Sequence, residues 1–373
     1  MHPMYKRASS PQTSINQKHG SRFAGLAKTF TAGIFLSGIL LGGATSSVSA
    51  AWENATGNLA NMPSECGNLC LLSVVPGRDV VIAGIAKQGL WKSADDGATW
   101  TAIGKDAGSD SIVNRPSRIL YDPVNPDIFY ESGIYNGPGV YKTTDGGKTF
   151  QHLGKIGHND YISVDFSDPK RLTMLAGGHE QSQKLWKSTD GGQNWTNIGL
   201  NLPAGTKFSS NPLLLEQDTY LVNASGWGRG TGGVYRTTDG GATWQSVSTL
   251  EASGAPLLAS DGTIYWELIW DKGVIRSHDQ GKTWEQACGY GVIKGTAIIE
   301  LPDGKLCAVG EKCVKISPDK GTTWKQFGDP LPVQPAGVVY SPTRKALFIW
   351  HWDCGAKVQP DAIFRCDYPP KAN

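Results

Sequence analysis

The sequence has little net charge, no cluster of basic residues in its main part and no long apolar run after its first fifty residues. It contains 35 basic and 33 acidic residues. Five of the basic residues and none of the acids lie in the first fifty positions, which leaves 30 against 33 and a formal charge of −3 for the rest. Nucleic acids attract proteins through clustered positive charge. We therefore expect no nucleic-acid partner.

The first fifty residues have the composition of an export signal. Their basic residues are accompanied by an apolar stretch at 30–43, and Val48-Ser49-Ala50 resembles a cleavage site. We expect a signal peptide at 1–50 and a mature chain at 51–373 that is secreted to the extracellular or periplasmic space, with no membrane association after cleavage. An uncleaved anchor is the alternative, but glycines interrupt a stretch that is short for a membrane span.

Cysteine is absent from the leader and present seven times after it, which suits an oxidising compartment. Two pairs, Cys307 with Cys313 and Cys354 with Cys366, bracket expected hairpins, so we predict a disulfide within each pair. A third disulfide is predicted between Cys66 and Cys70, which leaves Cys288 unpaired. No second pair or histidine follows Cys66-x3-Cys70 at the spacing of zinc ligands, so we expect no metal there.

One short motif of the form Ser/Thr-x-Asp-x-Gly-x-Thr/Asn-Trp/Phe occurs six times. The copies are spaced at 40 to 50 residues, the period expected when each repeat builds one four-stranded sheet. They begin at Ser93, Thr143, Ser188, Thr237, Ser277 and Ser317. The spacing predicts an all-β fold of the propeller type.

The residues of the motif are those of a folded turn rather than of a reactive site. The aspartate can accept hydrogen bonds from the turn backbone, the glycine permits a positive φ, and the aromatic residue can pack between sheets. The motif is identified as the Asp-box, or bacterial neuraminidase repeat, of sialidase-like propellers. This resemblance implies that each copy joins the third and fourth strands of a blade.

The length after residue 50 predicts seven blades at about 45 residues each. Six would carry an Asp-box. The seventh would contain strands at 346–352 and 362–368, completed by an N-terminal strand near 71–75 or near Trp52, so that both ends of the chain close the ring. We expect a single propeller domain at 51–373, without a linker, and a monomer.

Because the strands are antiparallel, two sets of loops lie on the face opposite the Asp-boxes: the links between blades and the loops joining strands two and three. We call this face the mouth. In the third blade, for example, we expect strands at 161–166, 172–176, 184–187 and 195–198. The candidate site residues are those of the mouth loops with polar or aromatic side chains: Arg115, Tyr135, Asn136, His158, His179, Glu180, Trp227, Arg229, Trp270, His351 and Asp353.

Some of these candidates also have a purely structural interpretation. His158 could merely cap a turn, whereas His179 follows two glycines and precedes a polar run. Histidine titrates near neutral pH and suits acid and base roles. Trp227 and Arg229 lie in a glycine-rich loop that could be only a surface turn, but a tryptophan suits sugar stacking and an arginine can clamp a carboxylate.

The resemblance to sialidases does not extend to their catalytic residues. Their arginine-isoleucine-proline signature is absent before the first Asp-box, and no convincing pair of tyrosine and glutamate is found. The segments 156–160, 164–166, 176–180, 201–205 and 219–222 instead resemble a group of secreted microbial propeller lyases that release rhamnose from an α-1,4-linked glucuronate. This resemblance implies β-elimination by a polysaccharide lyase on a substrate with an acidic sugar.

The lyase resemblance assigns roles to part of the candidate set. His158 and His179 would be the acid and base, Arg229 would bind the carboxylate, and Arg115 could be a second clamp. The other candidates would bind substrate. No cofactor is expected to be required. Calcium could bind carboxylates at the mouth, but no ligand run of recognised spacing is present.

Two alternatives remain open at this point. A glycoside hydrolase of the xyloglucanase or sialidase-like type would use a pair of carboxylates, with Asp160 or Glu180 acting together with Asp271 or Asp353. A propeller without catalytic activity would instead bind glycans or partner proteins through exposed aromatic residues. The three hypotheses differ in product: an unsaturated uronate, a reducing sugar, or none.

Overall fold

The computed structural model describes residues 50–370, apart from 226–230 and 296. The expected signal peptide lies outside the described residues except for Ala50. Trp227 and Arg229 also lie outside them, so their predicted roles stay predictions. Within the part of the chain that is described, no helix is long and apolar enough to cross a membrane.

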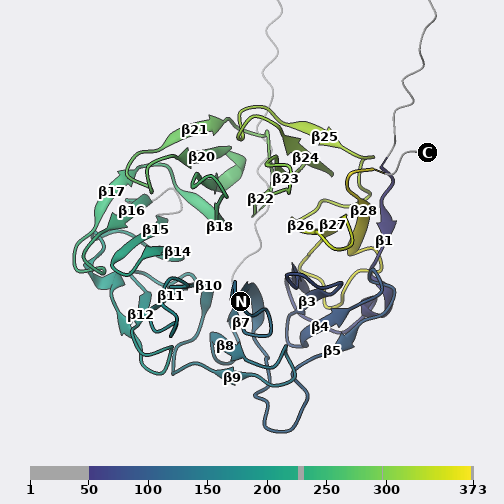
Figure 1. The fold of residues 1–373 in the computed structure, drawn as a ribbon, viewed down its shortest axis with the longest axis horizontal. Coiled ribbons are helices and arrows are strands. Elements are labelled where there is room, and N and C mark those ends of the chain that lie inside the picture. The colour runs from purple at the N-terminus through teal and green to yellow at the C-terminus, as the bar shows by residue number, and fades with distance from the viewer. Residues whose placement is uncertain (1–49, 226–230, 296, 371–373) are drawn as a thin grey trace, which may run out of the picture. The chain divides into compact units, whose positions relative to one another are not determined.

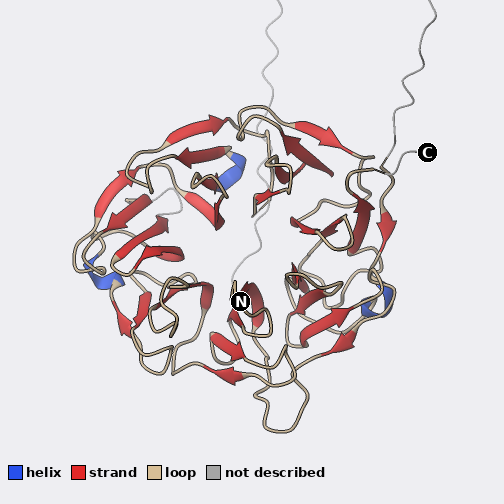
Figure 2. Ribbon diagram, in the orientation of Figure 1, coloured by secondary structure: helices blue, strands red, loops and turns tan. Residues whose placement is uncertain are grey.

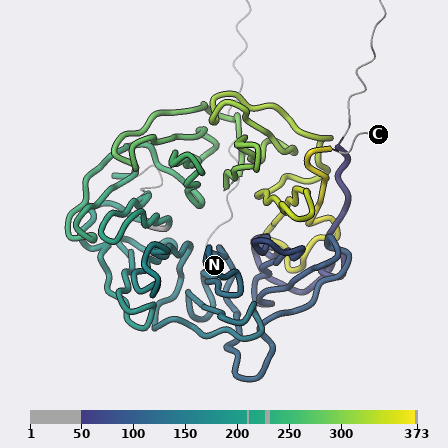
Figure 3. The backbone as a smooth tube through the Cα atoms, in the orientation of Figure 1, coloured from purple at the N-terminus to yellow at the C-terminus, as the bar shows by residue number. Residues whose placement is uncertain are grey.

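The described residues form seven four-stranded antiparallel sheets arranged around a common centre (Figure 1). Strands make up nearly all of the regular structure (Figure 2). The chain passes from one sheet to the next in sequence order, as the tube in Figure 3 shows. The prediction of a seven-bladed propeller with six Asp-boxes is therefore confirmed.

Each of the first four blades is built from four strands that are consecutive in the sequence. They are β2 (Leu69–Val74), β3 (Val81–Ile85), β4 (Gly89–Ser93) and β5 (Thr101–Ala102); β6 (Arg115–Tyr121), β7 (Phe129–Ile134), β8 (Val140–Thr143) and β9 (Gln151–His152); β10 (Asn159–Val164), β11 (Met174–Gly178), β12 (Leu185–Ser188) and β13 (Thr196–Asn197); and β14 (Phe208–Glu216), β15 (Thr219–Ser225), β16 (Gly233–Thr237) and β17 (Gln245–Ser248).

The last three blades complete the ring. They are β18 (Ala252–Leu258), β19 (Ile264–Leu268), β20 (Val274–Ser277) and β21 (Glu285–Cys288); β22 (Ile299–Glu300), β23 (Leu306–Gly310), β24 (Cys313–Ser317) and β25 (Lys325–Phe327); and β26 (Gly337–Ser341), β27 (Ala346–Trp350), β28 (Ile363–Asp367) and β1 (Glu53–Asn54). Three short 3-10 helices accompany them: η1 (Gly57–Leu59), η2 (Gly199–Asn201) and η3 (Ile269–Asp271).

The ring closes where the N-terminal strand β1 pairs with β28 of the seventh blade. Glu53 lies opposite Arg365 and forms an ion pair of 2.7 Å with it. The closing strand is therefore the one next to Trp52, whereas residues 71–75 belong mostly to β2 of the first blade. In Figure 1, purple β1 lies beside yellow β28.

The disulfide pattern differs from the prediction. Cys66 is bonded to Cys354, 288 residues away in sequence, and the other five cysteines are free. The three predicted pairs are wrong because of strand register and ring closure. Cys307 and Cys313 lie at opposite ends of their hairpin, where they pair with Ile316 and Gly310. Ring closure brings the segment before β2 against the loop after β27.

Apolar residues are buried mainly between neighbouring blades. Between the first two blades, Ile82, Phe129 and Phe150 form part of one buried cluster. Phe150 is the aromatic residue of the second Asp-box, and its ring centre lies 5.6 Å from that of Phe129. The aromatic position of the motif thus packs as the sequence indicated, and each blade depends on its neighbours for burial.

The Asp-box turns share one hydrogen-bond pattern, which the first copy illustrates. The Ser93 hydroxyl donates to Asp95 and accepts from the Gly97 amide, at 2.8 and 2.9 Å. The Asp95 carboxylate also accepts from the Thr99 hydroxyl and amide. Bonds from Thr99 and Ser93 lower the pKa of Asp95 to about 2. All six Asp-box aspartates have a pKa of about 2.

We expect the free energy of unfolding to fall steeply only below about pH 4. The Asp-box carboxyls have lower pKa values in the folded state, so their contribution is present above the unfolded value and is lost as pH falls toward 2. Denaturant unfolding at pH values from 7 to 2 measures this. Asp95→Asn should weaken the dependence, whereas Asp106→Asn, at a carboxylate with no hydrogen bond to described residues, should not. Equal dependence in both variants would contradict the assignment.

Two glutamates lie in the protein interior with unpaired carboxylate oxygens. Glu267 in β19 is 4% exposed, and neither of its oxygens has a hydrogen-bond partner among the described residues. Glu131 in β7 accepts one bond from Asn114. Burial raises the pKa of each carboxyl to about 8. Both are therefore protonated in the folded protein at neutral pH.

Glu267→Gln should stabilise the protein at alkaline pH. The carboxyl of Glu267 ionises near pH 4.5 when unfolded and near pH 8 when folded, so wild-type stability falls as pH rises between these values. The variant lacks this loss and should gain on the order of 5 kcal/mol above pH 8. Denaturant unfolding at pH 5 and pH 9 measures the difference. The exposed Glu216→Gln should have no such effect, and a gain equal at both pH values would rule out the explanation.

Candidate functional site

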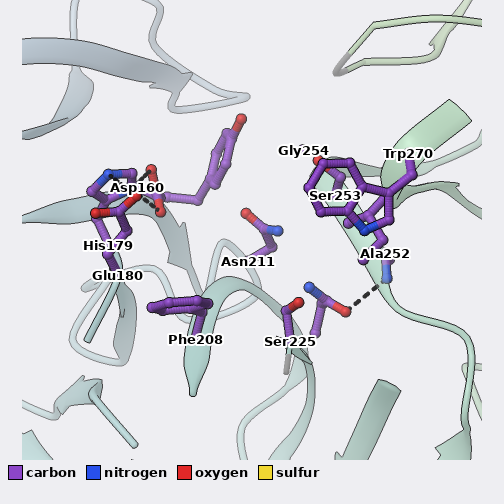
Figure 4. A pocket seen from close by; sticks show the side chains of 13 residues that line it. Asp160, His179, Glu180, Phe208, Asn211, Ser225, Ala252, Ser253, Gly254 and Trp270 are labelled. Carbon is purple, nitrogen blue, oxygen red and sulfur yellow. Dashed lines mark hydrogen bonds and ion pairs between the residues drawn. The ribbon is translucent and has the colours of Figure 1, made fainter. Parts of the chain in front are cut away.

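A cavity of ≈ 320 Å³ opens at the mouth between the third, fourth and fifth blades. Its walls bring together acidic, amide, hydroxyl and aromatic side chains (Figure 4). They include Asp160, Tyr161, His179, Glu180, Phe208, Asn211, Asn223, Ser225, Ser253 and Trp270. Four of the residues that the sequence analysis weighed, Asp160, His179, Glu180 and Trp270, thus line one cavity.

Local backbone features of the third blade place the acidic wall. Asp160 lies at a bulge in β10, where the pairing with β11 shifts between Asn159 and Ile162. His179 and Glu180 follow β11, and the His179 amide donates to the His158 carbonyl at 2.7 Å. Both His158 and Glu180 have positive φ angles, 56° and 49°. Such strain in residues other than glycine often accompanies a functional site.

His179 is the centre of a polar network. Its Nδ1 lies 2.9 Å from Asp160, and its Nε2 lies 3.3 Å from the Tyr135 hydroxyl and 3.9 Å from Glu180. The Tyr135 ring contacts the His179 and His158 rings edge to face, with centres 5.2 and 5.7 Å apart. One imidazole therefore connects two carboxylates and a phenol at the mouth.

The charges around His179 favour its protonated form. Burial lowers the pKa of this imidazole, but the hydrogen bond that it donates to Asp160 and the negative charges of Asp160 and Glu180 outweigh burial and raise the pKa overall. The side chains of His179 and Asp160 are only 17% and 16% exposed, whereas that of Glu180 is half exposed. Glu180 is thus the carboxylate of this network that is most open to a ligand.

An aromatic wall faces the acidic one. In Figure 4, Trp270 lies across the cavity from Asp160, His179 and Glu180, and Asn211 and Ser225 lie between. Trp270 is 48% exposed and has a φ of 61°. A flat apolar ring opposite hydrogen-bonding groups suits a sugar, whose ring has apolar faces and polar edges.

A second group of candidates lies at the mouth on blades one, two and seven. The Arg115 guanidinium stacks on Trp352 at 5.2 Å. Burial raises the pKa of Tyr135, and the nearby positive charge of Arg115 opposes this rise. Tyr135 thereby links this group to His179. Among the described residues, Arg115 forms no ion pair with a carboxylate. Asn136 donates to Glu65 at 2.9 Å.

Two candidates of the seventh blade serve the local structure and do not line the cavity. His351 bonds through Nδ1 to the Gln334 carbonyl at 2.8 Å. The Asp353 carboxylate accepts from Asn68, Gly355 and Gln359. These bonds connect the seventh blade to the first around the Cys66–Cys354 disulfide.

The sequence analysis missed the floor of the cavity. Asn211, Asn223, Ser225 and Ser253 come from β14, β15 and β18 of the fourth and fifth blades. They lie within strands rather than in mouth loops, so sorting by loops could not find them. Buried polar residues in strands that are otherwise apolar were the available signal.

No three His, Cys, Asp or Glu residues lie together in a way that could hold a metal ion, as far as the described ranges show. The cavity combines carboxylates, amides and aromatic rings, which is a donor set for hydroxyl-bearing ligands. The expectation that no cofactor is required stays a prediction.

Comparison with known proteins supports the repeat and the fold. The model of the BNR/Asp-box repeat matches residues 275–286. A probable oligoxyloglucan-reducing end-specific xyloglucanase of Neosartorya fischeri is 29% identical over 229 residues, which are 52% of this chain and 26% of that protein. Further xyloglucanases match about half of this chain. The chain spans about a quarter of the length of these curated relatives.

Solved structures share the fold at low identity. An ancestral GH74 enzyme has a TM-score of 0.55 at 16% identity, covering 77% of this chain and 44% of that one. YCF48 bound to a D1 peptide has a TM-score of 0.55 at 16% identity, covering 85% of this chain and 96% of that one. At this identity the similarity establishes the propeller architecture.

The comparisons overturn the expectation of a polysaccharide lyase. The relatives are xyloglucanases and the similar structures include GH74 enzymes, which are hydrolases and not lyases. The lyase prediction rested on short segments of blades two to four. Those segments include the strand and loop that carry Asp160 and Glu180, carboxylates that also suit hydrolysis.

Asp160→Asn should lower the pKa of His179. The variant removes the charge that favours the imidazolium, while burial continues to disfavour it. In the wild type, the stabilisation from this pair is present below the unfolded value of 6.5 and is lost as pH rises through the higher folded value. Titration of the imidazole signals by NMR measures the shift. Asp261→Asn is the control, and an unchanged pKa in Asp160→Asn would refute the network.

Proposed function

We propose that this protein is a secreted carbohydrate-active propeller that hydrolyses glycosidic bonds at its mouth. The xyloglucanase relatives support a polysaccharide or oligosaccharide as the substrate. The cavity supports the same conclusion, because carboxylates on one wall face an exposed tryptophan on the other. The composition of residues 1–50 supports secretion.

The observation that carries the proposal is the position of Asp160 and Glu180 on either side of one imidazole. Their oxygens lie 2.9 and 3.9 Å from the two nitrogens of His179. The two carboxylates are therefore separated only by the His179 imidazole and its contacts with each of them. Glycosidases place their two carboxyl groups about 5 to 9.5 Å apart, so this arrangement is compatible with the required pair.

The proposed reaction divides the work between the two carboxyl groups. One donates a proton to the glycosidic oxygen as the bond to the anomeric carbon breaks, and the other attacks that carbon or activates the water that does. Water supplies the hydroxyl of the new reducing end. Glu180, which is half exposed, suits the group that meets the sugar, and His179, whose Nε2 lies 3.9 Å away, orients it.

Asp271 is the alternative partner for Glu180. It follows Trp270 on the opposite wall, and its side chain is 41% exposed with Lys294 at 4.0 Å. Asp353 is less suitable because its carboxylate already accepts three hydrogen bonds within the structure. The two remaining pairs can be distinguished by substitution.

An acidic sugar in the substrate is a finer part of the proposal. Arg115 supports it, because this guanidinium has no carboxylate partner among the described residues and is stacked on Trp352 at the mouth. Arginine binds carboxylates through paired hydrogen bonds. A uronate placed there would lie beside Tyr135 and the His179 network.

Partner binding is the second candidate function. The specific observation is the length of the chain. This chain covers 96% of the YCF48 structure but only 44% of the GH74 enzyme. A propeller of this extent could bind a peptide at the mouth without catalysis. The test of hydrolysis separates the two.

Glu180→Gln and Asp160→Asn should each reduce hydrolysis by at least about a hundredfold, because each removes a group that acts on the bond. Release of reducing sugar from xyloglucan and from an acidic arabinogalactan is the measurement. Asp271→Asn distinguishes the alternative pair, and Asp261→Asn on the Asp-box face is the control.

Hydrolysis that survives Glu180→Gln would overturn the assignment of this residue. If the wild type releases no reducing sugar from either polysaccharide, partner binding becomes the better account. We expect no unsaturated product absorbing in the ultraviolet in any of these reactions.

A further inference from the structure

The exposed aromatic side chains are confined to one face of the propeller. Among the described residues, four aromatic side chains are exposed, and all four lie in mouth loops: Tyr135, Trp270, Tyr290 and Trp352. Tyr290 is 79% exposed, the largest fraction of the four. Tyr135 and Trp352 belong to the group around Arg115. Tyr290 has no part in the site described above.

Tyr290 and Trp270 lie on two loops that are joined to each other. The Gly291 amide donates to the Asp271 carbonyl at 2.7 Å. The Gln286 side chain donates to the carbonyls of Lys272 and Cys288, which again connects the two loops. The two aromatic residues therefore project from a shared frame, which we call the aromatic ledge.

Close backbone packing also holds the ledge in place. Gly273 has a φ of 109°, and a Cβ there would lie 2.0 Å from the Cys288 carbonyl oxygen. Only glycine permits this approach. Trp270 and Asp271 both have left-handed backbone angles, with φ of 61° and 55°. The strain is maintained by the hydrogen bonds around it and holds Trp270 at the edge of the cavity.

The charges near the ledge are arranged in a local group. Lys294 lies 4.0 Å from Asp271 and forms an ion pair with Glu311. Two further lysines lie at the same loops, because the Lys272 carbonyl accepts from Gln286 and Lys315 donates to the Val292 carbonyl. Acids and bases therefore both lie near the ledge.

We propose that the aromatic ledge is a binding subsite for uncharged sugar residues of a glycan chain that extends out of the cavity. Trp270 contacts the sugar at the cavity edge, and Tyr290 contacts a residue farther along the chain. Two exposed aromatic rings on loops that are hydrogen-bonded to each other match the alternation of apolar faces and hydroxyl edges along such a chain. The ledge thus selects for chain length.

This inference rests on the proposed function, because it takes a glycan as the ligand of the cavity. It concerns binding and not bond cleavage, so the two can fail separately. The assay therefore measures affinity in the Glu180→Gln background, where little substrate is consumed.

Tyr290→Ala should weaken binding of a long xyloglucan oligosaccharide about fivefold to tenfold and leave a short one unchanged, because only the long chain reaches beyond the cavity. Isothermal titration calorimetry with both lengths measures this. Trp270→Ala should weaken both. Tyr290→Phe retains the ring and should restore long-chain binding, and Leu258→Ala, at an exposed apolar residue on the Asp-box face, is the control.

Equal affinity of Tyr290→Ala and its parent for the long oligosaccharide would overturn the proposal and leave a protein surface as the occupant of the ledge. Absence of binding to either length would also overturn it. Loss of long-chain affinity in a protein whose wild type cleaves nothing would support the ledge and refute hydrolysis. If the wild type cleaves the polysaccharide and Tyr290→Ala does not change long-chain affinity, hydrolysis is supported and the ledge is refuted.

Discussion

Closure of the ring is the constraint on which the rest of this structure depends. Each sheet has two faces that are buried only by its neighbours, so a missing contact at one joint would expose two of them. The joint is made by a two-residue strand, β1, paired with β28. It is supported by the Trp100 indole, which donates to the Ala55 carbonyl, and by the Cys66–Cys354 disulfide. Segments from both ends of the chain therefore share one blade.

The same closure determines where the cavity forms. The Asp-box face consists of repeated turns whose side chains bond to their own backbone, so little is left there for a ligand. The mouth face has loops of unequal sequence from every blade, and their ends converge on the axis. The bulge at Asp160 and the left-handed backbone at Glu180 and Trp270 turn these side chains toward a common space. Irregularity in an otherwise repetitive fold is concentrated at the cavity.

The position of His179 shows how far sequence reasoning reached at the site. Its two preceding glycines and its place after the second strand of a blade indicated a mouth residue, and the structure places it in the cavity wall. Its partners Asp160 and Tyr135 come from other strands and another blade, so their distances could not be read from spacing. His351 and Asp353 satisfied the same loop criterion, but their bonds serve the seventh blade and its junction with the first. The loop criterion found the face and not the contacts.

The sequence by itself determined the repeat, the blade count and the face on which the cavity opens, because each Asp-box is a local turn whose hydrogen bonds join residues within a few positions. The partners in ring closure, the disulfide and the cavity floor were decided by tertiary structure alone. Cys66 meets Cys354, and Asn211 lies between Glu180 and Trp270, only because seven sheets pack into a closed ring. Local pattern encodes a blade, whereas contacts between residues far apart in sequence arise from the packing of all blades together.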